Sequence, residues 1–75
     1  MHNLSFDKAL ELLILGSKVS RSGWNAGGQW VKAQFPDENS KMGLPYLYLK
    51  NAQDLLIPWV PSQGDLFAKD WIVLD

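Results

Sequence analysis

Apolar residues near the N-terminus recur every three or four positions, at Phe6, Ala9, Leu10 and Leu13. Residues with this spacing share one face of an α-helix. Ser5 is a suitable N-cap, and Gly16 is of the residue type that commonly follows the last turn of a helix. The pattern therefore predicts a helix from Phe6 to Leu15.

Beyond Gly16 the pattern changes to short apolar runs separated by turn-forming residues. These runs predict five strands, at Val19–Arg21, Trp30–Phe35, Tyr46–Lys50, Leu55–Val60 and Trp71–Leu74. Pro58 lacks a backbone N–H, so the fourth strand is expected to lie at a sheet edge or to carry a bulge. The polar segment Asp37–Gly43 predicts an exposed loop, and Ser62–Ala68 is expected to form one helical turn.

One helix followed by about five short strands predicts an α+β fold, with the N-terminal helix packed on a mostly antiparallel sheet. We expect a single domain over residues 1–75. The helix can cover only one face of the sheet, whereas the leucines and the aromatic residues of the strands require two apolar faces. We therefore expect a second copy of the chain to cover the other face, in a homo-oligomer that is a dimer or a tetramer.

Composition narrows the classes of function. Seven basic and eight acidic residues nearly cancel, and no basic stripe is present, which argues against binding to a nucleic acid polymer. No apolar run approaches the roughly 20 residues that span a bilayer, so we expect a cytoplasmic protein without a membrane segment. There is no cysteine, and the single histidine, His2, lies beside a terminus, so neither a metal nor a cofactor is predicted.

The sequence also lacks the common motifs of metalloproteases, nucleotide hydrolases and enzymes with serine or cysteine nucleophiles. General acid–base chemistry would therefore fall to carboxylates, with Asp65 and Asp70 as the candidates. Aspartates beside a tryptophan are more often structural than catalytic. The sequence thus favours a binding protein over an enzyme.

A glycine-rich turn carries the first candidate binding residues, Arg21, Trp24 and Asn25. Turns lie at the surface, where a large aromatic ring is unusual. Two interpretations stay open. Trp24 can fold back as a lid on the core, or it can stack on a base while Arg21 and Asn25 bind phosphate or ribose.

A second candidate follows the fourth strand, in the run Ser62-Gln63-Gly64-Asp65. Ser62 and Asp65 have the spacing of a capping box at the start of a helical turn. Alternatively, Gln63 and Asp65 present an amide and a carboxylate to ribose hydroxyls or to a base edge. Asp70 is expected to be a turn residue rather than a ligand contact.

Taken in order, these segments resemble the sequence signatures of a known family. The run from Ala9 to Asn25, with its Gly-Trp-Asn turn, is similar to the family's N-terminal signature, and Leu44-Pro45-Tyr46 to its middle strand. The run from Pro58 to Trp71 is similar to its C-terminal signature, Pro-Trp-x-x-Ser-Gln-x-Asp followed by Ala-x-Asp-Trp. The family consists of small phage and bacterial domains and includes the second class of Thoeris anti-defence proteins.

The resemblance implies a function without catalysis. Members of this family are small homo-oligomers that sequester the cyclic ADP-ribose signals made by bacterial TIR-domain immune proteins, and some also hold cyclic dinucleotides. The resemblance implies a pocket formed by Phe6, Trp24, Gln63 and Asp65, with Arg21 and Asn25 as neighbours. The alternative is a structural or protein-interaction module whose aromatic residues form an oligomer interface.

Overall fold

The computed structural model describes residues 3–24 and 27–74. Its first element is the helix α1, Phe6–Ile14, which ends one residue before the predicted boundary. Gly16 has a φ of 101°, and the backbone N–H groups of Gly16 and Ser17 donate to the carbonyls of Leu13 and Leu12, both at 3.0 Å. This is the Schellman arrangement that a glycine permits. Ser5 occupies the N-cap position, but its hydroxyl donates to the Asp7 carboxylate instead of capping the backbone.

The five strands form one antiparallel sheet in the order β4-β3-β2-β1-β5. Their bounds are β1 Val19–Arg21, β2 Trp30–Gln34, β3 Tyr46–Lys50, β4 Leu56–Pro58 and β5 Trp71–Val73, and the short helix α2, Gln63–Phe67, precedes β5. The first four strands follow one another as a meander, and β5 then returns to pair with β1. The predicted α+β fold is confirmed, and Pro58 lies on an edge strand as expected.

Strand register separates the two faces of the sheet. In the β2–β3 pairs, Val31 lies opposite Leu49 and Ala33 opposite Leu47, so these side chains share one face. That face packs on α1 around a buried core. The core consists of Ala9, Leu13, Val19, Val31, Leu49 and Trp71. The leucines of β3 therefore lie on the helix side of the sheet.

The opposite face of the sheet has a different composition. Lys32 pairs with Tyr48 and Trp30 with Lys50 across β2 and β3. The rings of Trp30 and Tyr48 meet edge to face with 6.1 Å between centroids, and the ammonium group of Lys18 lies 5.2 Å from the Trp30 centroid. We call this the outer face. It carries half-buried aromatic rings between lysine side chains.

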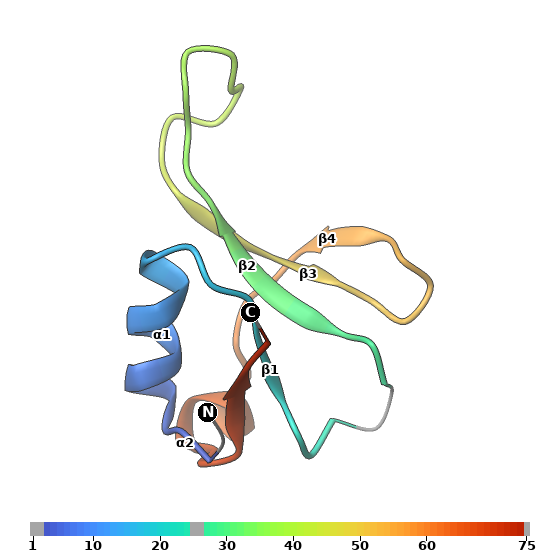
Figure 1. Cartoon of the computed structure of the whole chain (residues 1–75). Coiled ribbons are helices and arrows are strands. Elements are labelled where there is room, and N and C mark those ends of the chain that lie inside the picture. The colour runs from blue at the N-terminus through green and yellow to red at the C-terminus, as the bar shows by residue number, and fades with distance from the viewer. Residues whose placement is uncertain (1–2, 25–26, 75) are drawn as a thin grey trace.

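Two peripheral segments complete the fold. The loop between β2 and β3 extends away from the helices (Figure 1), and residues 37–43 in it are mostly exposed, as predicted. At the other end of the molecule, Leu4 exchanges two backbone hydrogen bonds with Trp71, at 2.8 and 3.1 Å, along the free edge of β5. Within the described residues, no helix is long and apolar enough to span a bilayer.

Candidate functional site

Four aromatic rings from separate segments meet on the helix side of the sheet. Trp71, in β5, is fully buried, and its ring centroid lies 5.4 Å from Phe6, 5.6 Å from Trp24 and 6.1 Å from Trp59. Trp24 and Trp59 also contact each other, at 6.4 Å. Most of these pairs have the edge-to-face geometry that aromatic quadrupoles favour. We call Phe6, Trp24, Trp59 and Trp71 the aromatic cluster.

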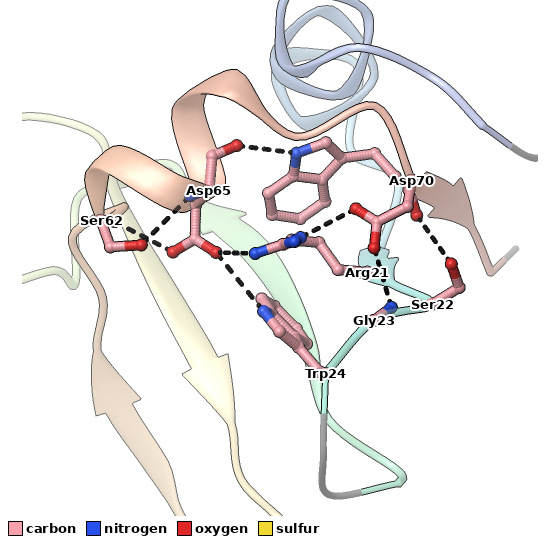
Figure 2. A network of polar contacts seen from close by, with 8 residues as sticks. Arg21, Ser22, Gly23, Trp24, Ser62, Asp65 and Asp70 are labelled. Carbon is pink, nitrogen blue, oxygen red and sulfur yellow. Dashed lines mark hydrogen bonds and ion pairs between the residues drawn. The ribbon is translucent and has the colours of Figure 1, made fainter.

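Beside this cluster the guanidinium of Arg21 lies between two carboxylates, as Figure 2 shows. Its Nη1 donates to Asp65 Oδ1 and its Nε to Asp70 Oδ1, both at 2.8 Å. The side chains of Arg21 and Asp65 are only 22% and 11% exposed, so water screens their charges poorly. The three residues come from the end of β1, from α2 and from the residue before β5. We call them the Arg21 network.

Asp65 is the most heavily used acceptor of the network. Its Oδ1 also accepts from Trp24 Nε1 at 3.4 Å, and its Oδ2 accepts from the backbone N–H of Ser62 at 2.9 Å. The Ser62 hydroxyl accepts in turn from the backbone N–H of Asp65, which completes a capping box. The backbone carbonyl of Asp65 accepts from Trp71 Nε1 at 3.1 Å. The capping-box interpretation of this motif is therefore confirmed.

Asp70 attaches the glycine turn to the same network. Its Oδ2 accepts from the backbone N–H of Gly23 at 2.8 Å. A Cβ atom at position 23 would lie 2.6 Å from that oxygen, which is closer than such atoms come in folded proteins. Only glycine therefore lets the backbone approach the carboxylate so closely. Ser22 adds backbone and hydroxyl hydrogen bonds to the Asp70 carbonyl.

The contacts keep both acids ionised. Burial raises the pKa of Asp65, but hydrogen bonds from Ser62, Arg21 and Trp24 outweigh it and hold that pKa below its usual value. The pKa of Asp70 is lowered chiefly by its hydrogen bond with Arg21. The pKa of Arg21 is raised by the hydrogen bonds to Asp70 and Asp65.

We predict that the folded state loses stability in acid, as the pH falls below about 4. A carboxylate whose pKa is lower in the folded chain contributes stability above its unfolded pKa and loses it as the pH drops through the folded value. Urea unfolding between pH 2.5 and 7 measures this effect. The Asp70→Asn variant should show a flatter pH dependence, and Glu11→Gln, at an exposed ion pair, serves as the control. Equal slopes for Asp70→Asn and the unaltered chain would contradict the assignment.

The structure brings together four of the six predicted site residues. Phe6 and Trp24 lie in the aromatic cluster, and Arg21 and Asp65 form the buried ion pair beside it. Gln63 is exposed at the first position of α2. Asn25 lies outside the described residues.

Sequence reasoning missed the roles of three further residues. Trp59 and Trp71 complete the aromatic cluster, and Asp70 is the second partner of Arg21. Asp70 does sit at a turn, as expected, but its side chain links that turn to Gly23. The two Trp residues that follow Pro58 and Asp70 were the available signal, because a tryptophan next to a turn commonly folds back on the core.

These groups are suited to binding a ligand rather than to catalysing a reaction. Both carboxylates are ion-paired and hydrogen-bonded, so neither is poised near neutral pH as a general acid or base. Over residues 3–24 and 27–74, no group of histidine, cysteine, aspartate and glutamate side chains has the arrangement of a metal site. The half-buried indole of Trp24 lies on a glycine turn, and hydrogen bonds to Asp65 and Asp70 hold the ring and the turn in place.

These features define a small α+β domain built around a tryptophan-bearing turn. The family model of the Thoeris anti-defense 2-like domain matches residues 4–74, and the chain belongs to this family. Thoeris anti-defense 2 of Bacillus phage SP01 is 32% identical over an 84-residue alignment, which covers 95% of this chain and 94% of the phage protein. The family membership supports an anti-defence role.

Proposed function

We propose that this protein binds and sequesters cyclic nucleotide immune signals without cleaving them. The signals are cyclic ADP-ribose isomers made by TIR-domain proteins and, as a second class to test, cyclic dinucleotides. It would act in the cytoplasm of the host cell. The observation that carries the proposal is the placement of Trp24, whose half-buried ring is held against Trp59 and Trp71 and bonded to Asp65.

A fixed indole suits the recognition of an adenine base. Stacking of a base on an aromatic side chain contributes about 1–3 kcal/mol. Because the ring is already restrained in the free protein, little conformational entropy is lost when a ligand stacks on it. Gln63, exposed at the start of α2, and Asn25 are proposed to supply hydrogen bonds, with Phe6 as the second aromatic residue of the site.

Affinity without turnover is what sequestration requires. A signal present at low concentration must be bound with a Kd near the nanomolar range, about −12 kcal/mol. Stacking together with several hydrogen bonds to the charged phosphates of the ligand, about 1.5–3 kcal/mol each, reaches this range. The paired state of Asp65 and Asp70 supports binding without hydrolysis, because neither acid is free to move a proton.

Isothermal titration calorimetry with a panel of cyclic ADP-ribose isomers and cyclic dinucleotides tests the proposal. We expect at least one cyclic ADP-ribose isomer to bind and to be released intact on heating, as seen by mass spectrometry. Trp24→Leu should weaken binding by about 5- to 150-fold, since it removes the stacking surface. Phe67→Leu, at a ring that is 79% exposed, is the matched control.

Two results would count against sequestration. Absence of heat with every member of the panel would favour the alternative, a structural or protein-interaction module. Conversion of the bound ligand into a hydrolysis product would indicate an enzyme.

We further propose that two copies of the chain associate through the outer face. Besides Trp30 and Tyr48, this face has a shallow hollow of about 220 Å³ next to β4. The hollow is lined by Gln34, Tyr46, Tyr48, Leu56, Ile57 and Pro58. The strand register places the helices on the other side of the sheet. This apolar and aromatic face is therefore suited to binding a second copy of the chain. Sedimentation equilibrium at micromolar concentration should give at least a dimeric mass, and a monomeric mass would refute association.

A further inference from the structure

Arg21 holds the two carboxylates that contact Trp24 and the turn before it. Its Nε and Nη1 groups already donate to Asp70 and Asp65 at 2.8 Å, and its side chain is only 22% exposed. One cation between two carboxylates leaves the Arg21 network with a single net negative charge. Such a network does not attract the phosphates of a nucleotide, because like charges repel at short range.

Arg21 acts on the Trp24 ring through a shared acceptor. Asp65 Oδ1 accepts from both Arg21 Nη1, at 2.8 Å, and Trp24 Nε1, at 3.4 Å. The short, charge-assisted bond from the guanidinium and the bond from the Ser62 backbone N–H together fix the Asp65 carboxylate, and the longer bond from the indole is made to that fixed group. The guanidinium is thus one of two groups that position the acceptor of the ring.

A second route restrains the backbone that carries the ring. Arg21 Nε holds Asp70 Oδ1, and the other oxygen of Asp70 accepts from Gly23, the residue before Trp24. The backbone N–H of Trp24 also donates to the Arg21 carbonyl at 3.2 Å. As Figure 2 shows, the guanidinium lies between the two carboxylates that hold the ring and the turn.

We propose that Arg21 is a positioning residue, which fixes the Trp24 indole through Asp65 and Asp70 and makes no contact with the ligand itself. The role in binding rests on the proposed function, whereas the effect on the free protein does not. Arginine is suited to this task because its planar fork donates to two acceptors in fixed directions. Lysine carries the same charge but lacks the fork, so Arg21→Lys separates geometry from charge.

The first experiment needs no ligand. The Trp24 indole N–H is assigned in nitrogen–proton NMR spectra by its loss in Trp24→Phe. We expect Arg21→Lys to shift this signal and to speed its exchange with water by about tenfold, as the acceptor is displaced. Lys8→Gln, which removes an exposed ion pair with Glu11, should leave the signal unchanged.

The Trp71 indole N–H reports on the fold in the same spectra, because it donates to the Asp65 backbone carbonyl inside the protein. A variant that keeps the Trp71 signal is folded. If Arg21→Lys loses it, Asp70→Asn replaces that variant, with the same expected direction for Trp24. An unchanged Trp24 signal in a folded Arg21→Lys or Asp70→Asn chain would overturn the proposal.

The second experiment is a double-mutant cycle on the affinity for cyclic ADP-ribose isomers. We expect Arg21→Lys to weaken binding by about tenfold in the unaltered background and by less than twofold in the Trp24→Leu background. Equal losses in both backgrounds would show that Arg21 contacts the ligand directly, contrary to the proposal. If no isomer binds the unaltered protein, the proposed function fails, and the Trp24 indole signal still decides whether Arg21 positions the ring.

Discussion

Replacing Trp71 with alanine is expected to lower the free energy of unfolding by about 3–5 kcal/mol, the usual cost of deleting a large buried aromatic ring. Trp71 is fully buried and contacts the other three rings of the aromatic cluster. Its Nε1 also holds α2 through the Asp65 carbonyl. A 75-residue domain has a total stability of about 4–11 kcal/mol. The expected loss is therefore a large fraction of the total stability.

Urea unfolding followed by far-ultraviolet circular dichroism measures this effect. Phe67→Ala is the matched control, because it also removes an aromatic ring, but one that is 79% exposed. Its effect should stay within about 0.5 kcal/mol. Similar losses for the two variants would show that the stability does not depend on the aromatic cluster.

The second large effect is expected for Asp65→Ala, at about 3–5 kcal/mol, because several hydrogen bonds to one poorly solvated carboxylate, worth about 1.5–3 kcal/mol each, are lost together. Arg21 would retain Asp70 but lose its more deeply buried partner, whose residue is only 8% exposed. The Trp24 indole and the Ser62 backbone N–H would also lose their acceptor. The capping box of α2 would disappear with the carboxylate.

Thermal and urea unfolding of Asp65→Ala and Asp54→Ala provide the comparison. Asp54 also forms an ion pair at 2.8 Å, with Lys50, but its side chain is 82% exposed. Exposed pairs contribute about 0–1 kcal/mol, so the control should change little. Asp65→Asn should fall between the two, since its amide oxygen can still accept one of these hydrogen bonds. A loss below 1 kcal/mol for Asp65→Ala would mean that the network is solvated.

Local sequence determined the individual elements because their signals act over a few residues. Helix α1 follows from apolar spacing, and its end follows from Gly16, whose backbone adopts a positive φ. The capping box at Ser62 and Asp65 spans three positions and was identifiable from residue types alone. Pro58 indicated an edge strand because proline has no backbone N–H to donate to a neighbouring strand.

Element boundaries were less well determined. The second, fourth and fifth strands are shorter than predicted, at Trp30–Gln34, Leu56–Pro58 and Trp71–Val73. The apolar pattern continues through Phe35 and Trp59, but apolar character does not show where ladder pairing stops. At Trp59 the backbone N–H still donates to the Leu47 carbonyl at 3.1 Å, while the side chain joins the aromatic cluster.

The site itself required the tertiary structure. Arg21 lies 44 residues from Asp65 and 49 from Asp70, and nothing in local spacing relates a cation to acids so far along the chain. The contact arises because β5 returns to pair with β1, which places Arg21 opposite Trp71. The sequence alone thus determined the helix, the strand pattern, the cap and the family signatures, since these depend on neighbouring residues. Strand order decided that Arg21 meets both aspartates and that Trp24 packs against Trp59 and Trp71, because such contacts depend on which distant segments the sheet brings together.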